Sequence, residues 1–99
     1  MASTQDTIAA LATPTGTSAI AVLRISGPDT KSLVEKIAGV LPSPRVATRA
    51  DYRDAAGDLV DDVLLTYFAG PASYTAEDTL EISCHGNPFI AQRILEDLP

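Results

Sequence analysis

The chain has 99 residues, of which 45% are hydrophobic, and a formal net charge of −6, values that suit one small globular domain. This acidity argues against a domain that grips a phosphate backbone by itself, because such binding requires a face rich in lysine and arginine. The single cysteine excludes an internal disulfide, and no apolar run approaches the roughly 20 residues that cross a bilayer. Since no secretory leader opens the chain, we expect a reduced, cytoplasmic protein.

The first half of the chain predicts two strands and a helix. Residues 8–12 form a short apolar strand, and residues 13–18, with proline, glycine and hydroxyl side chains, form a loop. Residues 19–25 are a continuous apolar run, which is typical of a central strand. Residues 26–29 carry capping, proline and acidic signals for the start of a helix, and Gly39 is a typical helix end.

The second half predicts a hairpin, a third long strand and a final helix. Residues 46–53 form a weaker edge strand that a turn joins to a strand over residues 59–68. Residues 79–84 alternate cleanly, so that Glu81 points away from the core side. Asn87 is a plausible cap for a helix with an apolar stripe. We therefore expect an α+β domain over residues 1–99, with a mixed β-sheet of about five strands and two helices.

Residues 70–86 contain most of the side chains that can do chemistry, but no motif for turnover. No phosphate-binding G-x-x-x-x-G-K-[ST] motif occurs. Cys84 and His85 are neighbours that a strand sends in opposite directions, which disfavours both a metal site and a cysteine nucleophile. The acids Glu77, Asp78 and Glu81 are candidates for general acid or base catalysis, but such a cluster is more often a solvated surface.

Arg24 and Glu81 are the two charges within otherwise apolar predicted strands. Burying either of them without a partner would cost several kcal/mol, so each must meet a partner or a ligand. One interpretation is a salt bridge between them. The other is a pocket in which the carboxylate accepts paired N–H donors and the guanidinium meets an oxygen-rich group.

Four segments of the chain carry a resemblance to a known family. The first three are Asp6–Ala10 with Ala12–Gly16, Ala21–Gly27, and Leu41–Arg45, and the fourth and strongest is Gly70–Gly86. Together they resemble the N-terminal domain of the MnmE (TrmE) family of tRNA-modifying GTPases, in which the fourth segment has the pattern G-P-x-S-[FY]-T-G-E-D-x-x-E-x-x-x-H-G. Two positions depart from the family, because Ala76 replaces a glycine and Asn87 replaces the glycine after His85-Gly86.

The resemblance implies a domain that binds a tetrahydrofolate of the 5-formyl type and holds two protomers together as a homodimer. The family's folate contacts fall on Arg24 and Glu81 of this sequence. In the family, the full-length protein works with an MnmG-type flavoprotein on the wobble uridine of certain tRNAs. GTP, Mg²⁺ and K⁺ belong to a GTPase domain that this sequence does not contain, so we expect ligand binding without turnover.

The chemistry of a pterin suits these residues. Its ring N–H and exocyclic amino group form a donor pair that a carboxylate such as Glu81 accepts in bidentate fashion. Arg24 then contacts either the pterin carbonyl or the glutamyl tail, and the residues do not decide between the two. Tyr74 is the candidate to lie against the flat ring, and Phe68 is a second one that core packing also explains. The alternatives are a dimerisation scaffold without a ligand and a hydrolase that uses Glu77, Asp78 and His85.

Overall fold

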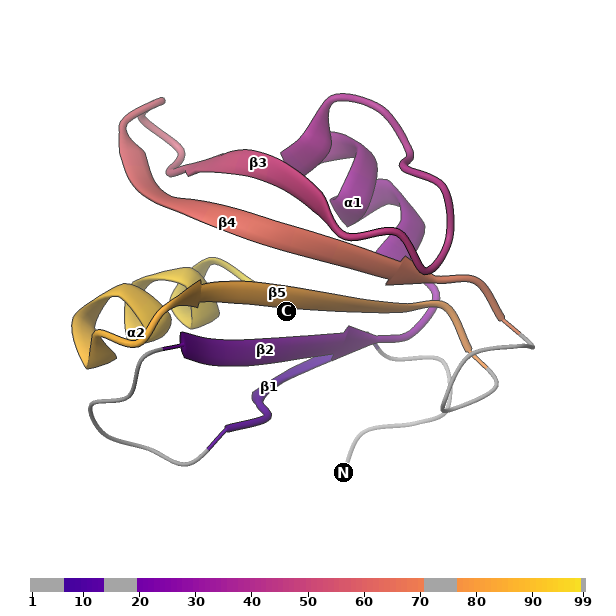
Figure 1. Ribbon diagram of the computed structural model, residues 1–99, viewed down its shortest axis with the longest axis horizontal. Coiled ribbons are helices and arrows are strands. Elements are labelled where there is room, and N and C mark those ends of the chain that lie inside the picture. Colours follow the sequence, from indigo (N-terminus) through magenta and orange to yellow (C-terminus); the bar gives the residue numbers. More distant parts are fainter. Residues whose placement is uncertain (1–6, 14–19, 71–76, 99) are drawn as a thin grey trace.

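The computed structural model describes residues 7–13, 20–70 and 77–98, which form five strands and two helices (Figure 1). In chain order the elements are β1 (Ile8–Leu11), β2 (Ile20–Ser26), α1 (Thr30–Ala38), β3 (Thr48–Arg53), β4 (Leu59–Phe68), β5 (Thr79–His85) and α2 (Pro88–Asp97). The predicted α+β class, the number of strands and the two helices are confirmed. Among these residues no helix is long and apolar enough to span a membrane.

The strands form one sheet in the order β1-β2-β5-β4-β3, and all four pairs of neighbouring strands are antiparallel. The expectation of a mixed sheet is therefore wrong for the described strands. The reason is the connection after α1, which places β3 at the far edge of the sheet (Figure 1). The chain then runs back through β4 to β5, and each of these strands is antiparallel to the one before it. The hairpin itself is confirmed, with a register shift between Tyr52 and Arg53.

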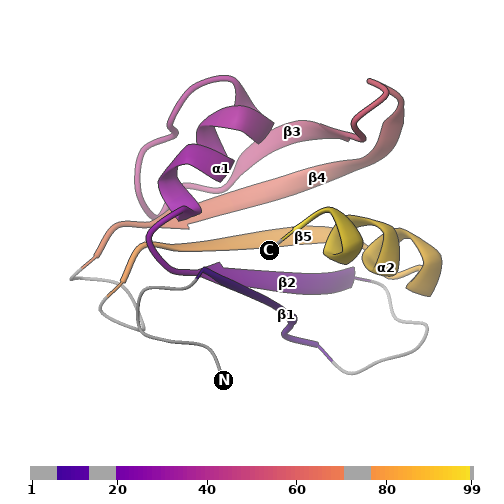
Figure 2. The ribbon, with the colours of Figure 1, turned by 180° about the vertical axis from the view of Figure 1, so that it is seen from behind.

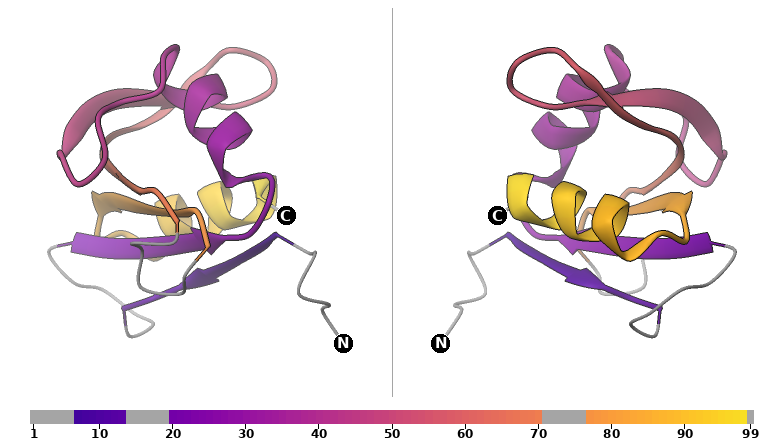
Figure 3. Two further views of the ribbon diagram at one scale, coloured as in Figure 1. Left: turned by 90° about the vertical axis from the view of Figure 1, so that its right-hand side faces the viewer. Right: turned by 90° about the vertical axis from the view of Figure 1, so that its left-hand side faces the viewer.

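Both helices pack on the same face of the sheet. Figure 2 shows α1 and α2 in front of the strands, and the end-on views of Figure 3 show them within the curve of the sheet. α1 contacts β3 and β5, whereas α2 contacts β1, β2, β4 and β5. We call the side that carries the helices the covered face, and the opposite side, which neither helix covers, the open face.

The core lies between the helices and the covered face. Strand residues alternate so that every second side chain of β2, β4 and β5 points into it. From the helices, Val34 and Ile94 are fully buried. The fully buried strand residues are Leu23, Ile25, Leu65, Leu80 and Ile82, with Val63 nearly so.

The helix ends follow local sequence signals, with one correction. Asn87 caps α2, and its side chain accepts a hydrogen bond from the Phe89 N–H at 2.8 Å. α1 begins at Thr30, later than predicted, after Asp29, which occupies the cap position without a side-chain capping bond. The Asp29 N–H instead donates to Thr7 Oγ1 at 2.8 Å. Gly39 ends α1 with φ of 84°, a left-handed conformation that glycine adopts without steric cost.

The burial of the central strands predicts a sharp difference between two isoleucines on neighbouring strands. Ile82 of β5 has no exposed surface, whereas Ile20 of β2 is 56% exposed on the open face. Ile82→Ala should lower the free energy of unfolding by about 3 kcal/mol, because it removes buried methyl groups and leaves a cavity. Ile20→Ala should cost less than about 1 kcal/mol. Urea unfolding followed by circular dichroism measures both, and equal losses would contradict this placement of the core.

Candidate functional site

Arg24 and Glu81 form an ion pair at the centre of the open face. They lie directly opposite one another on the neighbouring strands β2 and β5. Arg24 Nη2 donates to Glu81 Oε2 at 2.7 Å, and Arg24 Nε donates to the same oxygen at 3.1 Å. The two side chains retain 41% and 30% of their surface exposed. The structure thus brings together the two charges that the sequence singles out.

The strand register explains why these two residues meet. In both strands the residues on either side of the charge, Leu23 with Ile25 and Leu80 with Ile82, are fully buried on the covered face. The pleat then directs Arg24 and Glu81 to the open face, where side chains of opposed residues lie about 5 Å apart. Because both are partly solvated, the pair should contribute only about 0–1 kcal/mol to stability.

The pair uses only part of the hydrogen-bonding capacity of Glu81. Arg24 Nε and Nη2 both donate to Oε2, and within the described residues no donor reaches Oε1. An ionised carboxylate offers about four acceptor sites, so Glu81 retains sites for another donor pair while Arg24 holds its orientation. Thr66 of β4 lies opposite Glu81 on its other side.

The residue pairs on either side of Glu81 along β4 and β5 give the open face both apolar and polar side chains. One neighbouring row contains Phe68 of β4, and the other contains Leu64 and Ser83. Ser83 and Leu64 also line a shallow hollow of about 240 Å³ that extends to Arg49 and His85. Arg49 Nε pairs there with Asp62 Oδ1 at 2.9 Å, in a second ion pair that is more exposed than the first.

Asp78 makes two hydrogen bonds at the end of the segment between β4 and β5. Its carboxylate accepts the Gly70 N–H at 2.9 Å, and its carbonyl accepts the Gly27 N–H at 3.2 Å. Burial, and then the nearby Asp78 carboxylate, raise the pKa of the Tyr67 hydroxyl. Both the predicted ring contact, Tyr74, and the departure at Ala76 lie outside the described residues. The Asp78–Gly70 hydrogen bond therefore holds the two ends of this segment next to one another.

The comparisons with known proteins show the family of the chain. A sequence model of the family described as "GTP-binding protein TrmE N-terminus" matches residues 7–99. Proteins named tRNA modification GTPase MnmE are 63% identical to 95% of the chain in Opitutus terrae and 42% identical to 94% of it in Nitrosococcus oceani. The chain belongs to the TrmE N-terminal family. It spans about a fifth of the length of these relatives, 21% and 20% respectively.

The TrmE-type domain buries its only cysteine, which lowers the reactivity of the thiol. Cys84 is 3% exposed on the covered face, and burial followed by the charge of Asp61 raises the pKa of its thiol. A thiol is less reactive when its pKa rises, because the thiolate is the nucleophile. Cys84 and His85 point in opposite directions, as predicted. Among the described residues no group of three or more potential metal ligands occurs.

His85 is the last residue of β5 and has a partner that sequence reasoning missed. Its N–H donates to Asp61 Oδ2 at 2.9 Å, and its Nδ1 lies 2.8 Å from Asp61 Oδ1. Asp61 is only 9% exposed, in a core-facing position of β4. Burial opposes its ionisation most strongly, but the hydrogen bonds from His85 and Asp62 and the charge of His85 together lower the pKa of Asp61. The sequence did contain a signal for this contact, because Asp61 is an acid at a core-facing position of an alternating strand and so needs a partner.

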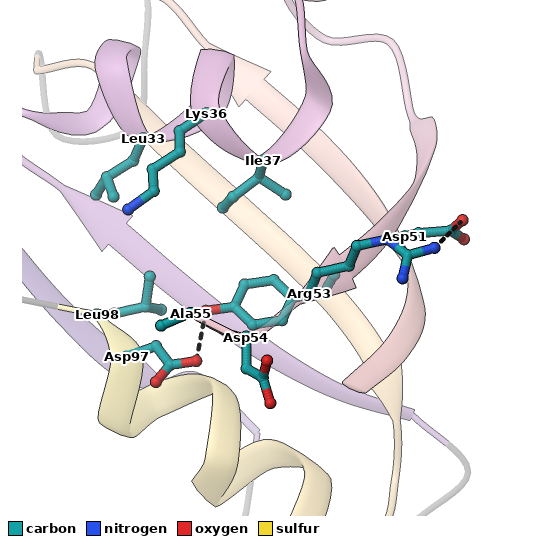
Figure 4. Close-up of a pocket in the computed structure, with 10 residues that line it drawn as sticks. Leu33, Lys36, Ile37, Asp51, Arg53, Asp54, Ala55, Asp97 and Leu98 are labelled. Carbon is teal, nitrogen blue, oxygen red and sulfur yellow. Dashed lines mark hydrogen bonds and ion pairs between the residues drawn. The ribbon is translucent and has the colours of Figure 1, made fainter. Parts of the chain in front are cut away.

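The covered side also contains cavities that sequence reasoning missed. Figure 4 shows one of about 370 Å³ between α1, β3 and the end of α2. In it the Tyr52 hydroxyl donates to Asp97 Oδ2 at 3.3 Å, and burial and then Asp97 raise the pKa of Tyr52 to about 12. A second, mostly apolar hollow of about 310 Å³ lies where α2 begins, beside the exposed Phe89. No sequence motif identified either of them, because they form between elements.

The Asp61–His85 contact predicts a pH-dependent contribution to stability. Because the pKa of Asp61 is lower in the folded than in the unfolded chain, its contribution is complete above about pH 5 and is lost as the pH falls through the folded pKa. Asp61→Asn should cost about 1–2 kcal/mol at pH 7 and progressively less toward pH 3. Urea unfolding across this range tests it.

The matched control is Asp62→Asn on the next residue of β4, whose partner Arg49 is exposed on the other face. It should change the free energy of unfolding by less than about 0.5 kcal/mol at every pH. If both variants show the same pH dependence, the buried Asp61 contact does not make the contribution assigned to it.

Proposed function

We propose that this domain binds a tetrahydrofolate derivative of the 5-formyl type on the open face, with Arg24 and Glu81 as contacts. The observation that carries the proposal is the half-exposed Arg24–Glu81 pair on the uncovered face of a TrmE-type domain. A buried pair would be inaccessible to a ligand, and a fully solvated one would be poorly oriented. This pair is both accessible and held in one geometry.

Glu81 is the residue best suited to recognise the pterin. A pterin presents a ring N–H beside an amino group, and a carboxylate accepts such a donor pair in bidentate fashion. The acceptor sites that Arg24 leaves open supply this capacity. Arg24 holds the carboxylate in place through its two hydrogen bonds to Oε2.

Tyr74 is proposed to lie against the flat ring of the ligand. The segment that contains it begins after Gly70 and ends before Glu77, and its two ends are joined by the Asp78–Gly70 hydrogen bond. That bond lies where β4 ends and β5 begins. In this proposal the Tyr74 ring adds stacking area to the site.

We further propose that the domain forms a homodimer and serves a larger tRNA-modifying GTPase. The relatives are named tRNA modification GTPase MnmE, and exposed apolar side chains such as Ile20 and Leu64 on the open face are suited to a protein contact. An MnmG-type flavoprotein and tRNA are partners of the full-length protein in the cytoplasm. GTP, Mg²⁺ and K⁺ are proposed to bind outside the region that this chain covers, so residues 1–99 act without turnover.

Calorimetric titration with 5-formyltetrahydrofolate tests folate binding. Glu81→Gln keeps the size of the side chain but replaces one acceptor oxygen by a donor, so the affinity should fall by about 10- to 100-fold. Arg24→Ala should weaken binding to a similar degree, because it removes a contact and frees the carboxylate.

The matched controls are Asp62→Asn and Arg49→Ala, which break another ion pair of the open face. Neither should change the affinity by more than about twofold, since surface pairs contribute little by themselves. Equal affinities of the wild type, Glu81→Gln and Arg24→Ala would remove both residues from the site. Sedimentation velocity at several protein concentrations tests the homodimer, and a monomer throughout would contradict it.

The second candidate is a scaffold in which the Arg24–Glu81 pair is structural and no small molecule binds. The 2.7 Å separation of Arg24 Nη2 and Glu81 Oε2 favours it, because the pair is already formed. It requires that Glu81→Gln lower the free energy of unfolding equally with and without the folate. The folate-binding proposal instead requires the ligand to stabilise the wild type and to stabilise the variant much less.

A further inference from the structure

Arg45 has an unusual backbone conformation at the edge of the open face. Its φ is 66°, and it is the only residue other than glycine with a positive φ in the described part of the chain. This left-handed region is unfavourable for a residue with a Cβ and persists where the surroundings hold it. Here the Arg45 N–H donates to the Tyr67 carbonyl at 2.8 Å, which ties the connection between α1 and β3 to the end of β4.

This conformation sets the guanidinium of Arg45 over an aromatic ring. Arg45 Cζ lies 5.8 Å from the centre of the Phe68 ring, within the range of a cation–π contact. The side chain of Arg45 is nevertheless exposed. Arg45 thus brings a positive charge to the edge of the open face, beside Phe68.

The strand register connects Phe68 to the Arg24–Glu81 pair. Thr66 lies opposite Glu81, and Phe68, two residues later on the same face, lies opposite Thr79. Phe68 is therefore a diagonal neighbour of Glu81, at a backbone separation of about 7–8 Å. Along this diagonal the open face presents a carboxylate, then an aromatic ring, then a cation.

This order matches the chemistry of a folate, which has a pterin with N–H donors at one end, a benzoyl ring in the middle and a glutamyl tail with carboxylates at the other. We propose that Arg45 binds the tail carboxylates and that Phe68 contacts the benzoyl ring. This assignment rests on the proposed function of the site.

The assignment also separates the roles of the two arginines. Arg24 directs both Nε and Nη2 to Glu81, which places its guanidinium at the pterin end. A chain with a net charge of −6 repels an anionic tail, so tail recognition needs a local positive charge. Arg45 supplies this charge at the far end of the diagonal.

The test compares 5-formyltetrahydrofolate with 5-formyltetrahydropteroate, which lacks the glutamate, by calorimetry on the whole chain. The wild type should bind the glutamylated compound about tenfold more tightly, and raising the salt concentration should reduce this preference. Arg45→Gln should abolish the preference by weakening binding of the glutamylated compound alone. The control Arg49→Gln, another exposed arginine, should leave both affinities unchanged.

Arg45→Gly provides a second variant, because glycine adopts the positive φ without strain while the guanidinium is lost. It should lose the preference as Arg45→Gln does, and circular dichroism verifies the fold of both. If the wild type binds the two compounds equally, or if both variants weaken them equally, the tail assignment is wrong while folate binding stands. If the wild type binds neither compound, the proposed function itself fails.

Discussion

The antiparallel register of β2 and β5 is the constraint on which both the core and the candidate site depend. It sets Leu23 opposite Ile82 on the covered face and Arg24 opposite Glu81 on the open face. Because side chains alternate, a slip of one residue would expose the first pair and bury the second. The apolar contacts under the helices therefore also fix the geometry of the ion pair, which need not contribute to stability itself.

The two faces of the sheet differ in solvent exposure because both helices pack on the same side. α1 and α2 exclude water from the covered face, where Cys84 and most of the large apolar strand residues are buried. The open face retains partly solvated polar groups between apolar ones. A ligand that binds there meets side chains positioned by a rigid sheet, so little ordering of the protein is required on binding.

The sequence predicted the features that depend on local pattern. The alternation of residues 79–84 placed Glu81 correctly, and Asn87 acts as the predicted cap. The prediction of a mixed sheet was wrong, because the direction of a strand depends on where the preceding connection enters the sheet. Asp61 and His85 meet although they lie 24 residues apart on different strands, and no local pattern encodes such a contact.

The Arg24–Glu81 pair was only partly predictable from the sequence. Two charges within apolar strands had to find partners, and their meeting was one of two open interpretations. The structure confirms the contact, yet a salt bridge and a ligand site are compatible here, because Arg24 occupies only one oxygen of the carboxylate. An apolar pair in these opposed positions would stabilise the sheet at least as well as a half-exposed ion pair. Stability alone therefore does not explain two charges at the centre of the open face, and the proposed recognition of a ligand with paired N–H donors would account for them.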